Sequence, residues 1–219
     1  MSIFLSCKKN DFYDIKDVTI VIGDSGNVKI KSLDIKIETN GTYNFDVNND
    51  GVNDFALWNV YVNDVISKSG YYYCSLKALS ENSKVLCDTI SLSKGSFFFA
   101  PKPLFIKDTI SAAEGLWLSS TDLLEDPGPY PSRGYYYPSD GFLIYSFYDP
   151  WYPPQLPGVA KGGIPWEEFM TFKEKYIGIL SEKNGIATMG WIMLTYSPMY
   201  QVTLNELGTA DFPLEGHQH

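Results

Sequence analysis

Histidine is almost missing from this chain of 219 residues, because its two copies, His217 and His219, both lie at the extreme C-terminus. Histidine is the side chain most often used as a general base in catalysis. The sequence also has no phosphate-binding glycine loop and no cysteine in a reactive context, so the usual set of nucleophile, base and orienting group is unfilled. We therefore expect a protein that is not an enzyme.

Basic residues and long apolar runs are scarce as well. Seventeen Lys and Arg stand against twenty-six Asp and Glu, which gives a formal net charge of −9. Such a chain repels a polyphosphate backbone, so nucleic acid is excluded as a partner. No stretch reaches the roughly 18 apolar residues needed to cross a bilayer, so we expect any membrane attachment to come from a lipid.

Cysteine occurs only three times, and the first copy lies in a distinctive context. Residues 3–7 read Ile-Phe-Leu-Ser-Cys and are followed at once by Lys-Lys-Asn. This segment resembles the end of a bacterial lipoprotein signal peptide, which is cut before a cysteine that is then acylated. The resemblance implies lipidation of Cys7 and a place in the cell envelope, at the outer membrane or cell surface. The alternative is an ordinary N-terminus with an incidental cysteine.

The other two cysteines, Cys74 and Cys87, flank a polar cluster at residues 80–83 that favours a turn. A disulfide across the resulting hairpin would leave Cys7 as the odd cysteine and would fit an oxidising compartment. Two buried thiols are the alternative, since cysteine is often buried without a partner.

Alternating apolar and polar residues and a 16% aromatic content favour strands over helices. We expect a hairpin of residues 17–22 with 28–39 and a C-terminal three-stranded meander with a turn at Lys183-Asn184-Gly185. Segment 104–118 is compatible with helix or strand. The expected strands cover residues 17–22, 28–39, 42–45, 54–62, 71–79, 84–90, 95–99, 141–148, 175–180, 190–196 and 201–207.

Two segments, 125–138 and 149–165, are rich in Pro, Gly and Tyr and predict long surface loops. The strand expected between them makes them insertions in one sheet scaffold. The sequence thus predicts an all-β, two-sheet antiparallel sandwich or jelly roll with long Pro/Gly/Tyr-rich loops. We assign residues 1–16 to a signal remnant and tether, 17–212 to a single domain and 213–219 to a flexible tail.

An acidic loop, Asp46-Val47-Asn48-Asn49-Asp50-Gly51-Val52-Asn53-Asp54, carries oxygen-bearing side chains at its first, third, fifth and ninth positions and Gly at its sixth. Such spacing lets oxygens converge on a hard cation. The loop resembles DxDxDG calcium loops, but Leu57 replaces the bidentate Glu of the EF-hand. We predict a structural Ca²⁺ held by Asp46, Asn48, Asp50, Asp54 and the Val52 carbonyl; the alternative is a metal-free turn.

A wider resemblance joins this loop to residues 175–178, Lys-Tyr-Ile-Gly, and 189–194, Met-Gly-Trp-Ile-Met-Leu. The same order is found in secreted β-sandwich proteins of Gram-negative bacteria, which are mostly uncharacterised and often lipoproteins. Met189 and Met193 replace the Tyr and Arg usual in those proteins, so no role of that Arg carries over. The resemblance implies a fold and a compartment. For Trp191, core packing is the favoured interpretation.

Aromatic side chains in the Pro-rich loops suggest a ligand surface, because a stiff backbone can present flat rings to a sugar. The candidates are Tyr135, Tyr137, Trp151 and Tyr152, with packing under the loops as the alternative. We expect a lipid-anchored envelope protein that binds an extracellular glycan. A protein partner is the competing ligand, and a glycan-processing enzyme with two carboxylates is a second alternative. The sequence does not indicate the oligomeric state.

Overall fold

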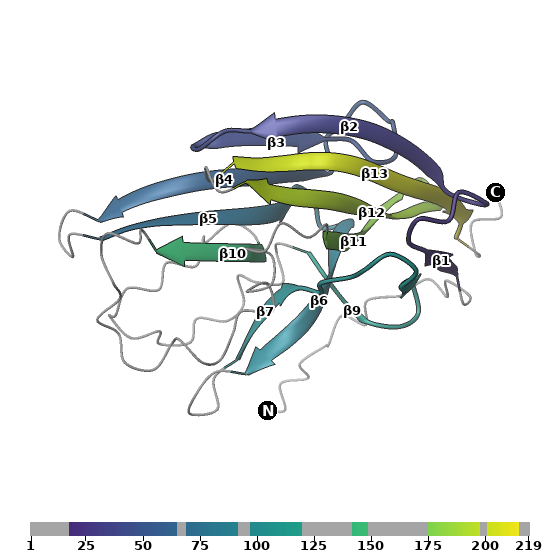
Figure 1. Ribbon diagram of the computed structural model, residues 1–219. Coiled ribbons are helices and arrows are strands. Elements are labelled where there is room, and N and C mark those ends of the chain that lie inside the picture. Colours follow the sequence, from purple (N-terminus) through teal and green to yellow (C-terminus); the bar gives the residue numbers. More distant parts are fainter. Residues whose placement is uncertain are drawn as a thin grey trace, which may run out of the picture.

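The computed structural model describes residues 18–64, 69–91, 97–119, 142–148, 175–197 and 201–214. All secondary-structure elements in these ranges are β-strands. None of the described segments forms a helix able to span a membrane. The strands build a four-stranded sheet, a seven-stranded sheet and a two-stranded ribbon (Figure 1). This confirms the predicted all-β class, and the two larger sheets pack as a sandwich.

The four-stranded sheet is antiparallel and has the order β10-β5-β4-β3. Its strands follow the alternating segments expected in this part of the sequence, and the loop between β3 and β4 contains the acidic residues. The bounds are Gly41–Phe45 for β3, Phe55–Asp64 for β4, Ser69–Ala78 for β5 and Phe142–Tyr148 for β10.

The seven-stranded sheet has the order β2-β13-β12-β11-β6-β7, with β9 paired to β6. The predicted C-terminal meander is confirmed as β11, β12 and β13. Asn184 and Gly185 join β11 to β12 with φ of 51° and 77°, as a two-residue turn of type I′ requires. The bounds are Lys29–Ile37 (β2), Ser83–Ser91 (β6), Phe97–Pro101 (β7), Leu116–Leu118 (β9), Lys175–Lys183 (β11), Ile186–Ser197 (β12) and Gln201–Pro213 (β13).

The ribbon pairs β1, Thr19–Val21, with β8, Thr109–Ser111. The predicted hairpin of residues 17–22 with 28–39 is therefore wrong. The chain leaves the ribbon after β1 and enters the edge of the seven-stranded sheet, where β2 pairs with β13. The local pattern correctly located both strands and the turn. It could not predict their pairing partners, because these lie about ninety residues away for β1 and about one hundred and seventy for β2. Segment 104–118 contains the short strands β8 and β9, with a turn at 106–107 and bends at 112–115, and no helix.

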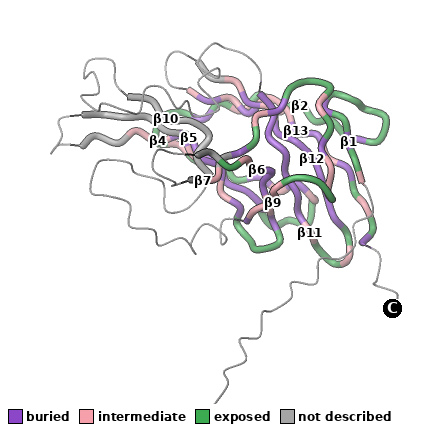
Figure 2. Tube along the Cα trace, turned by 90° about the horizontal axis from the view of Figure 1, so that it is seen from below, coloured by how far each residue is buried: buried purple, intermediate pink, exposed green. Residues whose placement is uncertain are grey.

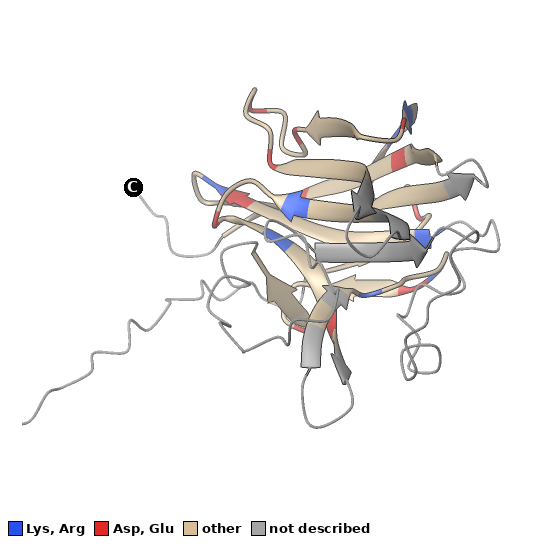
Figure 3. Ribbon diagram, turned by 90° about the vertical axis from the view of Figure 1, so that its left-hand side faces the viewer, with Lys and Arg blue, Asp and Glu red and all other residues tan. Residues whose placement is uncertain are grey.

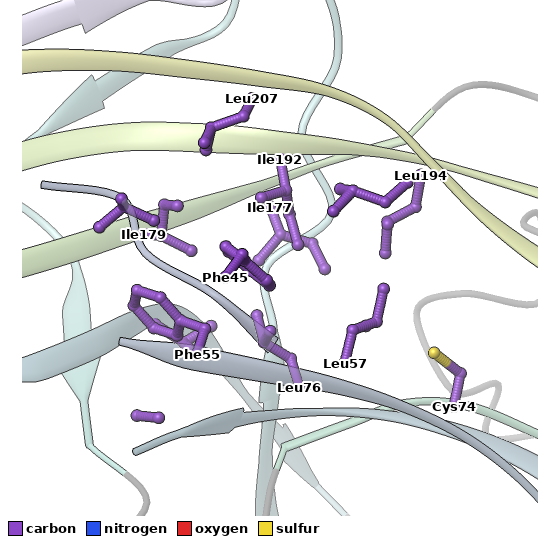
Figure 4. Close-up of a cluster of buried hydrophobic side chains, with 14 of the residues drawn as sticks. Phe45, Phe55, Leu57, Cys74, Leu76, Ile177, Ile179, Ile192, Leu194 and Leu207 are labelled. Carbon is purple, nitrogen blue, oxygen red and sulfur yellow. The ribbon is translucent and has the colours of Figure 1, made fainter. Parts of the chain in front are cut away.

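Strand β11 explains how the layers are joined, because it is buried on both faces. Ile177 and Ile179 point into a core shared with Phe55 and Leu76 of the four-stranded sheet (Figure 4). On the opposite face, Leu180 joins a second core that lies under the ribbon and includes Ile20, Ile110 and Trp191. The ribbon is thus a third layer, and the burial of Trp191 confirms its predicted packing role.

Burial follows this layered arrangement. Buried positions run along the strands that cross the middle of the molecule, and exposed positions gather at turns and outer edges (Figure 2). In the view of Figure 3, acidic and basic residues are scattered over strands and turns and do not gather into a field of one sign.

Candidate functional site: the acidic loop and its neighbours

The acidic loop between β3 and β4 is closed by its own side chains. The Asp46 carboxylate accepts hydrogen bonds from the backbone N–H of Gly51 at 2.7 Å and of Asp50 at 3.3 Å. The turn requires left-handed backbone at Asn49 and Gly51, with φ of 58° and 86°, which Asn and Gly adopt most readily. The Asn/Asp/Gly composition therefore specifies the loop shape directly.

Two further side chains continue this closure. Asn48 Oδ1 accepts from Asp50 N at 3.1 Å, and Asp50 Oδ1 accepts from Val52 N at 2.8 Å. Both are local side-chain-to-backbone bonds of the kind that Asn and Asp form in turns. The Val52 side chain itself is 60% exposed. Side chains of the loop thus accept from the backbone N–H groups of Asp50, Gly51 and Val52.

Asp54, the ninth residue of the loop, faces the interior and is only 8% exposed. Its Oδ2 accepts from Val47 N at 2.9 Å, and its Oδ1 accepts from the Ser181 hydroxyl at 2.6 Å. Ser83 and Asn48 approach the same oxygen at 3.5 Å and 3.4 Å. Ser181 lies on β11 and Ser83 on β6, so this carboxylate ties the loop to the opposite sheet.

Lys183 brings a positive charge to the outer side of the loop. Its ammonium forms an ion pair with Asp50 from the end of β11, at the turn into β12. The hydrogen bond from Lys183, followed by that from the Val52 N–H, lowers the pKa of Asp50 below its ordinary value of 3.8. One carboxylate of the predicted calcium set is therefore already paired with a cation from the same chain.

The predicted calcium ligands do not all converge. Asp46, Asn48 and Asp50 share the outer part of the loop, whereas the Asp54 carboxylate is committed to Val47 and Ser181. Within the described ranges, no three His, Cys, Asp or Glu side chains are grouped so that they could hold a metal ion. In this arrangement only some of the predicted ligands could reach a Ca²⁺ ion, and the ion would have to replace the Lys183 ammonium at Asp50.

The two cysteines lie on different sheets, Cys74 on β5 and Cys87 on β6. The hairpin expected between them is wrong, because the turn at residues 79–82 carries the chain from one sheet to the other. No disulfide joins them, so the bond expected across that hairpin is absent. Both thiols are buried in the core between the sheets, and burial raises the pKa of the Cys74 thiol far above its ordinary value.

The predicted lipidation site and ligand-binding aromatics lie outside the described residues: Cys7, Tyr135, Tyr137, Trp151 and Tyr152. In the sequence, Tyr135 and Tyr137 precede β10 and the other two follow it. The described strand between them, β10, spans about 20 Å.

The comparisons with known proteins add no relative. No family model, curated protein or solved structure gives a significant match to this chain.

Two residues of this site were missed by sequence reasoning. Ser181 lies 127 positions from Asp54, and Lys183 had been noted only as part of a turn. The single available signal was the position of Lys183 beside Asn184-Gly185, which places it next to the turn of the β11–β12 hairpin. For neither residue does the local sequence predict a contact with the acidic loop.

Proposed function

We propose that this chain is a non-catalytic, lipid-anchored binding protein of the cell envelope and that its ligand is an extracellular glycan. The proposal is supported by the sequence on either side of β10, in which Tyr135 and Tyr137 precede the strand and Trp151 and Tyr152 follow it, and by the position of β10 at one edge of the four-stranded sheet. Aromatic rings presented from a stiff scaffold suit the apolar faces of sugar rings. The Ser6-Cys7 segment supports the envelope location.

A glycan array with the purified chain tests the ligand class. We expect binding to at least one glycan, with loss of the signal in Trp151→Ala. The matched control is Phe105→Ala, which removes an aromatic ring that is 46% exposed in the turn before β8. A chain that binds no glycan, and co-purifies instead with one stable protein partner, would favour the competing protein-ligand function.

The anchor is tested separately. Expressed with a complete export signal in a bacterium that acylates lipoproteins, the chain should enter the detergent phase with a mass increased by the lipid. Cys7→Ser should abolish both effects, whereas Cys74→Ser should keep them, because Cys74 is buried in the core. A Cys7→Ser protein that is still acylated would contradict the assignment of Cys7.

We further propose that the acidic loop binds Ca²⁺ through Asp46, Asn48, Asp50 and the Val52 carbonyl, in competition with Lys183. A metal bound only by the folded chain raises the melting temperature by mass action. We expect a rise with millimolar Ca²⁺ relative to chelator, a larger rise in Lys183→Gln, and none in Asp46→Asn. Equal melting temperatures with and without Ca²⁺ in Lys183→Gln would reduce the loop to a metal-free turn.

A further inference from the structure

The sequence contains two Asn-Gly dipeptides, and the fold surrounds them differently. They are Asn40-Gly41, between β2 and β3, and Asn184-Gly185, between β11 and β12. Both asparagines are exposed and have left-handed backbone, with φ of 61° and 51°. In such a dipeptide the glycine nitrogen can attack the asparagine side-chain amide, because glycine has no Cβ to obstruct the approach. The hydrogen bonds around each dipeptide decide how readily this happens.

In Asn40-Gly41 both reacting groups are held by hydrogen bonds. The Gly41 N–H donates to the Glu38 carbonyl at 2.9 Å. Asn40 Oδ1 accepts from the Tyr61 N–H at 2.9 Å, and because Tyr61 lies on the neighbouring strand β4, this bond fixes the side-chain amide in place. Both bonds would have to break before the Gly41 nitrogen could reach Cγ of Asn40. The fold thus protects this dipeptide.

Asn184-Gly185 has neither restraint. The two residues form the type I′ turn of the β11–β12 hairpin, which is closed by the residues on either side of them. Within the described ranges no group accepts a hydrogen bond from Gly185 N, and none is bonded to the Asn184 side chain. The Gly185 carbonyl does accept from Leu214 N at 2.7 Å. This bond leaves the attacking nitrogen and the amide that it attacks unengaged.

We propose that Asn184 is a site of spontaneous deamidation, which replaces a neutral amide by a carboxylate beside Lys183. The Gly185 nitrogen forms a bond to Cγ of Asn184 while the bond from Cγ to Nδ2 breaks, and ammonia leaves with the hydrogen of the Gly185 N–H. Water then opens the cyclic imide. Cleavage between Cγ and the nitrogen gives aspartate, and cleavage at the main-chain carbonyl gives isoaspartate, in which the backbone is longer. No oxidant or reductant is required.

The position of Asn184 links this modification to the acidic loop. Lys183, the preceding residue, forms the ion pair with Asp50. A carboxylate at position 184 attracts the same ammonium, and isoaspartate also lengthens a turn whose geometry requires two residues. Deamidation therefore weakens the hold of Lys183 on Asp50 and favours an external cation at the loop. Only this last effect rests on the proposed Ca²⁺ site.

The two dipeptides serve as controls for each other in the full chain. The purified protein is incubated at mildly alkaline pH, digested briefly in acid, where the reaction is slow, and followed by peptide mass spectrometry. We expect Asn184 to convert about tenfold faster than Asn40 or more, since two ordinary hydrogen bonds must first break at Asn40. Separate aspartate and isoaspartate products should appear. In concentrated urea the two rates should become similar, because the unfolded chain no longer protects Asn40.

The effect on the loop is measured in Asn184→Asp, which carries the new carboxylate from the start. An NMR titration should give a higher pKa for Asp50 than in the parent chain, and the matched change Asn40→Asp should leave it unaltered. Conversion of Asn184 no faster than that of Asn40 in the folded chain overturns the modification site. An unaltered Asp50 titration in Asn184→Asp overturns its link to the loop. A loop that binds no Ca²⁺ is recognised separately, by its melting temperature, and leaves both results standing.

Discussion

Asp50 and Asp54 belong to the same nine-residue loop, and the structure uses them in opposite ways. Asp50 lies at the surface and holds the ammonium of Lys183, while Asp54 is buried and accepts hydrogen bonds from Val47 and Ser181. An ion pair at the surface is screened by water and salt. A buried acceptor has no water to replace a lost donor.

This difference separates two tasks within one loop. The Asp54 end fixes the loop to β11 and β6 and thereby links the two sheets, while the Asp50 end faces solvent and can exchange its cation. The proposed exchange of Lys183 for Ca²⁺ would therefore take place at the outer side of the loop and leave its attachment to the fold in place. Substitutions at the two ends should differ in size and in their dependence on pH.

Asp54→Ala should produce the largest effect. It removes the acceptor for the Ser181 hydroxyl and the Val47 N–H at a site that is 8% exposed. We expect the free energy of unfolding to fall by about 2–4 kcal/mol, measured by urea denaturation. Asp54→Asn keeps the shape and one acceptor, so its loss should be smaller. Equal stability of Asp54→Ala and the parent chain would show that this carboxylate does not hold the loop.

Ser181→Ala should produce an intermediate effect, because it removes one donor and leaves the Val47 bond to Asp54 in place. We expect a loss of about 1–2 kcal/mol in the same denaturation experiment. A double-mutant cycle with Asp54→Ala should show strong coupling. The control is Ser83→Ala, whose hydroxyl lies 3.5 Å from Asp54 but 2.8 Å from the Ser80 hydroxyl. Additive losses for Ser181 and Asp54 would mean that the two residues act separately.

Much of the fold could be predicted from the sequence, because strand and turn signals are local. Apolar, β-rich runs located β4 and β11, and the Asn184-Gly185 dipeptide located the turn between β11 and β12. The pairing of β1 with β8 and of β2 with β13 could not be predicted, since it depends on packing between distant segments. The ribbon, and with it the third layer, was missed for this reason.

The candidate site divides in the same way. The position and closure of the acidic loop follow from its Asn, Asp and Gly residues alone. The equal treatment of Asp46, Asp50 and Asp54 as calcium ligands did not foresee that Ser181 turns Asp54 inward and that Lys183 pairs with Asp50. Spacing identifies which side chains alternate along a loop, but only tertiary contacts decide which of them face solvent.

The Asp50 end of the loop should show the smallest effect and the one that depends on pH. The pKa of Asp50 is lowered in the folded chain, first by Lys183, so the pair stabilises the fold above the ordinary aspartate pKa of 3.8. That stabilisation is lost as the pH falls through the lower folded value. Asp50→Asn should therefore lower the melting temperature slightly near neutral pH and hardly at all in strong acid.

A carboxyl titration followed by NMR assigns this effect to the ion pair. In Lys183→Gln the pKa of Asp50 should rise toward 3.8. It should stay below that value, because the hydrogen bond from Val52 N remains. Added salt should act in the same direction in the parent chain, because it screens a pair that lies at the surface. An Asp50 pKa that is unchanged in Lys183→Gln would assign the shift to the Val52 N–H, and the outer end of the loop would then be held by its own backbone alone.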